Sequence, residues 1–140
     1  MRKSVRNNSE KSGEKLRAAG LRPTRQRVAL ANLLFARGNR HLTAESLRAE
    51  AAEAGIEVSL ATVYNTLHQF TGAGLLRQVA VDASRFYFDT NTGAHQHFYD
   101  EEGATLIDIP GDSIAVAGVP NPPDGMEVER VDVVVRIRRA

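Results

Sequence analysis

The sequence predicts an α+β chain with an N-terminal winged helix followed by a C-terminal α/β lobe. Three observations support this fold class. Four segments with helically spaced apolar residues fill the first half, two strand-like runs follow them, and apolar and polar residues alternate in the last part. The 140 residues suit one compact unit or two small lobes, since a typical domain has about 100–200 residues.

The first helices follow from their capping residues. Residues 1–8 are polar and basic without periodicity, so we expect a flexible arm that could contact phosphate. A first helix is predicted from Ser9 to Gly20, and Pro23 separates it from the next segment. Thr24 then caps a second helix, whose apolar residues recur at helical spacing: Val28, Leu30, Ala31, Leu34 and Phe35.

The next two helices have the pattern of a helix-turn-helix. Thr43 caps a helix that ends before Gly55, and Ser59 caps another over residues 60–70. In the latter, Val63, Leu67 and Phe70 are predicted to face inward, and Thr62, Tyr64 and Asn65 outward. Residues 75–81 and 85–89, joined by a turn at 82–84, predict a hairpin that completes a winged-helix DNA-binding domain over residues 9–89.

The second half has the pattern of a small sheet. Residues 90–94 lack apolar content and predict a hinge, after which residues 95–100 and 104–109 predict two strands across a turn. Prolines between 110 and 125 oppose a long helix, although Asp112 could cap a short one over residues 113–117. Residues 126–138 alternate apolar and charged side chains and predict a strand, buried on one face, that could pair in a dimer.

Charge is distributed unevenly along the chain. The net charge is +1, but residues 1–80 contain 13 Lys and Arg against 6 Asp and Glu, whereas residues 81–140 contain 5 against 11. The basic half is therefore where we expect nucleic acid to bind. No apolar run approaches the roughly 18 residues of a membrane span, and no signal-like apolar segment follows Met1, so we expect a cytoplasmic protein without a membrane partner.

Potential metal ligands are split between the two halves. Cysteine is absent, which excludes disulfides and thiolate sites and leaves histidine and carboxylates as ligands. His95 and His97 are two residues apart and so point to one face of a strand, while Asp108 lies opposite on the next predicted strand. His41 lies in the helix-turn-helix region and Asp89 ends the hairpin. Such ligands suit Fe(II), Mn(II) or Zn(II).

Together these motifs resemble the ferric uptake regulator superfamily over nearly all of residues 10–140. The motifs are those at residues 19–27, 41–47, 60–67, 74–76 and 95–97. The sequence is most similar to the bacterial iron response regulators, because it lacks the four-cysteine zinc site of most members. Asp100 and Gly103 stand where the first cysteine pair would be, so no structural zinc is expected. Residues 95–140 are then expected to form a dimerisation and metal-sensing domain.

The resemblance implies which residues form the metal site and which contact DNA. One regulatory divalent ion per protomer would be held by His41, Asp89, His95, His97 and Asp108, with Tyr87 as an alternative to Asp89. Haem, as a competing ligand, would use His95 and His97. DNA contacts are expected from Arg22, Arg25, Arg27, Ser59, Thr62, Tyr64 and Asn65, with Asn65 suited to adenine and Tyr64 to thymine methyls.

These inferences predict a metal-dependent transcriptional regulator. Haem is the alternative effector, competing with the metal. The regulator would bind palindromic operators of iron and haem homeostasis genes as a homodimer, with the ion favouring the closed arrangement that matches the operator. A peroxide sensor of the same superfamily is the alternative. A mononuclear iron enzyme built on His95, His97 and Asp108 is a remote one, because five protein ligands nearly fill a coordination sphere and the helix-turn-helix would have no task. We therefore expect a protein that is not an enzyme.

Overall fold

The computed structural model describes the backbone of residues 2–140 and the side chains of residues 8–140. The chain divides into two compact units, the first ending at Thr92 and the second spanning Gly93–Ala140. Each unit is described by itself. Within the described residues, no helix is both long enough and apolar enough to span a membrane.

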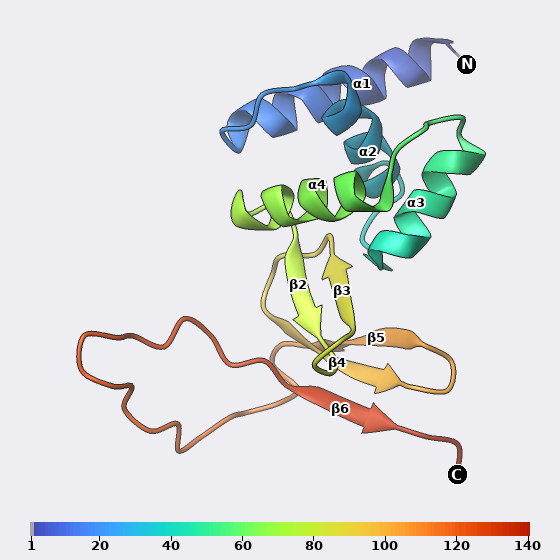
Figure 1. The fold of residues 1–140 in the computed structure, drawn as a ribbon. Helices are drawn as coiled ribbons and strands as arrows, with labels where there is room; N and C mark the ends of the chain where they lie inside the picture. Colours follow the sequence, from blue (N-terminus) through green and yellow to red (C-terminus); the bar gives the residue numbers. More distant parts are fainter. Residues whose placement is uncertain (1) are drawn as a thin grey trace. The chain divides into compact units, whose positions relative to one another are not determined.

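Four helices make up most of the first unit (Figure 1): α1 Arg2–Ala18, α2 Arg25–Phe35, α3 Ala44–Glu53 and α4 Leu60–Gly72. The helix α1 begins at Arg2, so the expectation of a flexible arm over residues 1–8 is wrong from Arg2 onward. Residues 2–8 contain neither proline nor glycine, and their lysine and arginines favour helix. We also predict that residues 1–8 could contact phosphate. The side chains of residues 1–7 lie outside the described ones, so this stays a prediction.

Capping residues begin the other three helices where the sequence predicts them. The Thr24 side chain accepts a hydrogen bond from Arg27 N at 3.2 Å, and Ser59 accepts one from Thr62 N at 3.1 Å. Thr43 forms a capping box with Ser46, in which each side chain accepts from the other residue's backbone N–H at 3.1 and 3.0 Å. These bonds satisfy donors that the first helical turn cannot pair internally.

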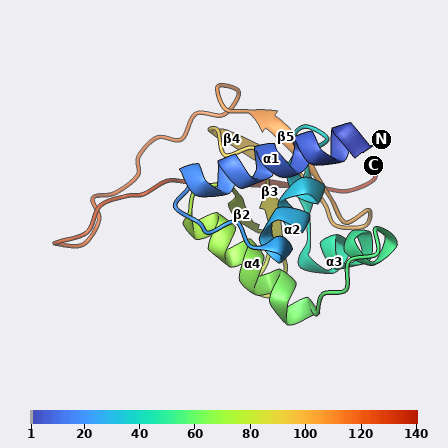
Figure 2. The ribbon, with the colours of Figure 1, turned by 90° about the horizontal axis from the view of Figure 1, so that it is seen from above.

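A continuous apolar core joins the helices. Figure 2 shows α1 lying against α2, which in turn lies against α3, while α3 also packs on α4. The predicted inward residues Val63, Leu67 and Phe70 are fully buried, which confirms the predicted core face of α4. The other buried members of this core come from α1, α2, α3, β1, β3 and the residue before β2: Leu16, Leu30, Ala31, Leu34, Leu42, Ala44, Leu47, Ala51, Leu76 and Phe88.

A three-stranded antiparallel sheet completes the first unit. Its strands are β1 His41–Leu42, β2 Arg77–Ala80 and β3 Phe86–Asp89, in the order β1-β3-β2. The predicted hairpin is confirmed as β2 and β3, so the first unit is a winged helix. Strand β1 was not predicted, because two residues are too few to show an alternating pattern. It places His41 opposite Asp89 in the register.

The second unit is built around a three-stranded sheet, visible as β5, β4 and β6 in Figure 1. Strands β4 His95–Asp100 and β5 Thr105–Pro110 are antiparallel, as predicted, and their register pairs His97 with Asp108. Strand β6 Val134–Ile137 lies parallel to β4 on its other side. Tyr99 is fully buried within this unit.

Two expectations for the second unit are wrong. The short helix over residues 113–117 is absent, because glycines and prolines punctuate residues 110–125. The strand expected over residues 126–138 is reduced to β6, and the side chains of residues 126–132 are exposed. Residues 134–137 pair with β4, whereas residues 126–132 pair with no strand of the described part of the chain. An alternating pattern of apolar and charged residues favours a strand, but a strand forms only where a neighbouring strand can pair with it.

Candidate functional site

His41 and Asp89 lie side by side in the first unit. The His41 Nε2 atom is 3.1 Å from Asp89 Oδ2, and the two residues are direct partners in the β1–β3 ladder. The second carboxylate oxygen of Asp89 accepts a hydrogen bond from Asn91 N at 2.9 Å, which fixes the orientation of the carboxylate. The structure therefore places Asp89, one of the two alternatives for this position, beside His41.

His95, His97 and Asp108 converge in the second unit. Both imidazole Nε2 atoms approach the same carboxylate oxygen, Asp108 Oδ1, at 3.4 Å from His95 and 3.5 Å from His97. The two rings are nearly edge to face, with centroids 4.5 Å apart. Both histidines are buried, while the Asp108 side chain is partly exposed. Alternation along β4 and the β4–β5 register produce this convergence, as the sequence predicted.

Hydrogen bonding fixes the orientation of the His95 ring. Its Nδ1 atom lies 2.7 Å from the carbonyl oxygen of Gly93. Because a carbonyl oxygen only accepts, Nδ1 carries a proton, and Nε2 faces Asp108. Histidines that bind metals commonly have this arrangement, in which the second ring nitrogen donates to a carbonyl or carboxylate.

The chemistry available to these two groups is that of divalent ions. Imidazole nitrogen and carboxylate oxygen are ligands for Fe(II), Mn(II) and Zn(II) alike. The lone pairs of two imidazoles and one carboxylate facing a common point repel one another unless a cation or a proton lies among them. The chain has no cysteine, so it has no cysteine-bound zinc site.

The outward face of α4 carries polar side chains at its N-terminal end. Ser59 and Asn65 are exposed and Thr62 is partly exposed. The hydroxyl of Ser59 donates to Thr62 Oγ1 at 2.9 Å, so the two hydroxyls are held together at the start of the helix. Backbone N–H groups and hydroxyls at a helix N-terminus suit phosphate oxygens.

Tyr64 is held in place by two neighbours. Its hydroxyl donates to Glu45 Oε1 on α3 at 2.9 Å, and its ring stacks on His68 with centroids 6.3 Å apart. The hydrogen bond to Glu45 raises the pKa of Tyr64 above its ordinary value of 10.0, so the phenol stays protonated at neutral pH. Glu45 was not identified from the sequence, since it lies 19 residues from Tyr64 and only the packing of α3 on α4 brings them together.

The three candidate arginines differ in their surroundings. Arg22 and Arg25 are exposed near the N-terminus of α2. Arg27 is partly buried and donates to the Arg22 carbonyl oxygen at 2.9 Å and to Gln69 Oε1 at 3.1 Å. Arg27 therefore also connects α2 to α4, a structural role that the sequence did not reveal.

Comparison with known proteins identifies the family. Residues 18–134 match the Ferric uptake regulator family. The chain is 39% identical over 95 residues to the ferric uptake regulation protein of Pseudomonas aeruginosa, covering 67% of this chain and 71% of that protein. It is 31% identical over 106 residues to the peroxide-responsive repressor PerR of Staphylococcus aureus, covering 76% and 71%.

Solved structures agree with this assignment. The ferric uptake regulator of Pseudomonas aeruginosa, solved with manganese, has a TM-score of 0.67 and 28% identity, covering 91% of this chain and 97% of that one. The Vibrio cholerae regulator shares the fold, with a TM-score of 0.70 and 20% identity, covering 91% and 98%. These relatives do not separate the branches of the family. The chain thus belongs to the ferric uptake regulator family, whose members are metal-dependent transcription regulators and not enzymes.

Proposed function

We propose that this protein is a homodimeric, metal-dependent regulator that binds palindromic DNA operators in the cytoplasm. One divalent ion per protomer, Fe(II), Mn(II) or Zn(II), would be held by His41 and Asp89 of the first unit together with His95, His97 and Asp108 of the second. The observation that carries the proposal is the approach of two imidazole nitrogens to one carboxylate oxygen, Asp108 Oδ1.

The chemistry of the two ligand groups supports a shared ion. A pair or a trio of protein ligands leaves several coordination positions of Fe(II) or Mn(II) open, whereas the five together nearly fill the coordination sphere. The pair belongs to the unit that carries the helix-turn-helix, so an ion bound by both groups would restrict how the DNA-binding unit moves. The related regulator from Pseudomonas aeruginosa was solved with manganese, which fits such a donor set.

The proposed mechanism is a population shift. The dimer samples arrangements of its DNA-binding units, and His41 and Asp89 reach the remaining ligands only in the arrangement that fits the operator. When bound, the ion supplies a preference for that arrangement. Converting a mostly open dimer into a mostly closed one requires a preference of about 5 kcal/mol. Residues 90–94 would serve as the hinge.

For DNA, we propose that the N-terminal end of α4 reads the major groove through Tyr64 and Asn65. Ser59 and Thr62 would contact the backbone phosphates, as would Arg22 and Arg25. The excess of basic residues in this half of the chain supports the assignment.

Removing His41 tests the proposal. The variant His41→Ala should fold and dimerise, but Mn(II) should no longer tighten its binding to an operator at fixed salt. His68→Ala is the matched control for Mn(II) affinity, because His68 is the one histidine outside the proposed ligand set. Binding by His41→Ala that still rises with Mn(II) as in the wild type would contradict the proposal.

Peroxide sensing is the second candidate, and the similarity to the Staphylococcus aureus repressor favours it. In such a sensor, bound Fe(II) would promote oxidation of a ligand histidine, His41 or His95. Mass spectrometry would then show a gain of about 16 Da on one of these residues after peroxide treatment of the Fe(II) protein. A haem-responsive regulator would instead lose operator binding when haem is titrated in, through His95 and His97.

A further inference from the structure

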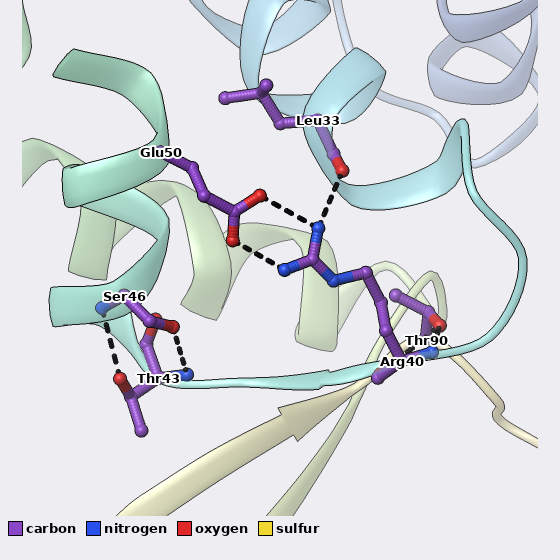
Figure 3. Close-up of polar contacts among 6 residues, drawn as sticks. All are labelled: Leu33, Arg40, Thr43, Ser46, Glu50 and Thr90. Carbon is purple, nitrogen blue, oxygen red and sulfur yellow. Dashed lines mark hydrogen bonds and ion pairs between the residues drawn. The ribbon is translucent and has the colours of Figure 1, made fainter. Parts of the chain in front are cut away.

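Arg40 is the point where three elements of the DNA-binding unit meet (Figure 3). Its Nη1 atom donates to the carbonyl oxygen of Leu33 at 3.2 Å, in the last turn of α2, and to Glu50 Oε1 at 2.9 Å. Its Nη2 atom donates to the other carboxylate oxygen of Glu50, on α3. Arg40 directly precedes β1, so one side chain ties this strand to two helices.

The backbone of Arg40 is paired as well. Its N–H donates to Thr90 Oγ1 at 2.8 Å, and its carbonyl oxygen accepts from Thr90 N at 3.1 Å. Arg40 is the neighbour of His41 in the chain, and Thr90 is the neighbour of Asp89. The segment that presents both proposed metal ligands of this unit is therefore hydrogen-bonded to the helices through Arg40, in addition to the apolar packing of Leu42 and Phe88 in the shared core.

The contact with Glu50 is geometrically demanding. A guanidinium donates two parallel hydrogen bonds to a carboxylate, whereas an ammonium donates from a single point. The side chains of Arg40 and Glu50 are only 24% and 30% exposed, so water competes less than it does at an open surface. Lysine at position 40 would keep the charge but could not bond Glu50 with two nitrogens and reach the Leu33 carbonyl as well.

We propose that Arg40, held by Glu50, is a positioning residue that transmits metal binding at His41 and Asp89 to the helix-turn-helix. This inference rests on the proposed function, because it assumes that these two residues hold the ion. The Arg40 contacts add directional hydrogen bonds from the start of β1 to α2 and α3, so a displacement of β1 is passed to both helices more strongly while these contacts persist. Without them, β1 still connects to α3 through the backbone at Thr43, and Leu42 and Phe88 still pack in the core, but apolar packing lacks the fixed direction of the Arg40 hydrogen bonds.

Two variants remove the paired hydrogen bonds of this contact while nearly conserving side-chain volume. Arg40→Lys keeps the charge, and Glu50→Gln keeps the shape but removes the carboxylate. Arg37→Lys is the matched control, since Arg37 is exposed and lies three residues away. Each variant is measured for Mn(II) affinity in the absence of DNA and for operator affinity with and without Mn(II). The ratio of the two operator affinities is the metal–DNA coupling, which is typically about 5–150-fold in allosteric proteins.

We expect Arg40→Lys and Glu50→Gln to bind Mn(II) within about twofold of the wild type, while the coupling falls at least about fivefold. The double variant should lose no more coupling than either single one, because both break the same contact. Arg37→Lys should behave like the wild type. A ratio of affinities is insensitive to a general loss of stability, which would weaken both measurements together.

Several results would overturn the proposal. Unchanged coupling in both variants would show that Arg40 transmits nothing. A loss of Mn(II) affinity as large as the loss of coupling would show that Arg40 only supports the ligands. Failure of the proposed function itself has a different signature, in which His41→Ala retains metal-dependent operator binding whatever the Arg40 variants do.

Discussion

At the scale of single residues, the helix-turn-helix places an acid where DNA is expected. Glu45 accepts a hydrogen bond from the Tyr64 hydroxyl, and it lies on α3, the helix before α4, which we propose as the recognition helix. Its charge opposes phosphate, yet its carboxylate fixes a side chain that we propose reads bases. Glu45 is therefore expected to weaken DNA affinity through its charge and to improve base discrimination by holding Tyr64. Two different substitutions separate these effects.

The first prediction concerns Glu45. Glu45→Gln removes the charge but keeps an acceptor, so it should bind operator and unrelated DNA more tightly at low salt. Glu45→Ala also releases Tyr64, and its discrimination against an operator changed at the base read by Tyr64 should fall about five- to tenfold, within the usual cost of about 1–3 kcal/mol per mismatch. Fluorescence anisotropy with both operators measures these effects. Glu53→Gln, an exposed acid at the end of α3, is the control. Equal discrimination in all three variants would contradict the role.

At the scale of elements, the turn between β4 and β5 is joined to the C-terminal segment by a carboxylate. Asp100 accepts from Gly103 N at 3.1 Å and from Arg139 Nη2 at 2.8 Å. The hydrogen bond from Gly103 and the guanidinium of Arg139 hold the pKa of Asp100 below its ordinary value. The resemblance places Asp100 and Gly103 where other members have the first cysteine pair of a zinc site. In this chain, Asp100 instead forms an ion pair with Arg139.

The second prediction follows from that pKa. The bonds of Asp100 stabilise the fold above the ordinary aspartate pKa of about 3.9, and the stabilisation is lost as pH falls through the lower folded-state pKa. The urea midpoint of the wild type should therefore exceed that of Asp100→Asn at pH 7, and the difference should shrink below about pH 4. Asp112→Asn, at an exposed carboxyl, is the control. A difference that stays constant down to pH 3 would show that Asp100 contributes packing and not charge.

The same scale shows what the sequence could predict. The capping residues Thr24, Thr43 and Ser59 begin helices because their side chains bond the third residue along, which is a purely local property. The convergence of His95, His97 and Asp108 was also predictable, because strand alternation and a short turn fix the register. Strand β1, Glu45 and the Arg40–Glu50 contact were not predictable, since each depends on packing between segments distant in the chain.

At the scale of the whole molecule, the second unit has more apolar surface than its own sheet covers. Met126, Val128 and Val131 are 68%, 49% and 37% exposed, although residues 126–129 and 130–133 each alternate apolar and charged side chains, with a change of phase between Glu129 and Arg130. Members of this family act as dimers on DNA, and in a symmetric dimer the same patch on each protomer is covered. We therefore expect the exposed apolar side chains of residues 126–133 to be covered by a second copy of the chain.

The last prediction tests this expectation. The substitution Val128→Asp is present in both protomers of a symmetric dimer. It therefore places two charges in the expected apolar interface. Burial of a valine contributes about 1.5–3 kcal/mol, so the dimer dissociation constant should rise at least about tenfold. Sedimentation velocity over a range of protein concentrations measures it, with Glu127→Gln as the control on the neighbouring exposed side chain. Because a palindromic operator requires two recognition helices, operator affinity should fall together with dimerisation, whereas Mn(II) affinity should not. A dimer as stable as that of the wild type would show that Val128 is not covered in the interface and would contradict the expectation.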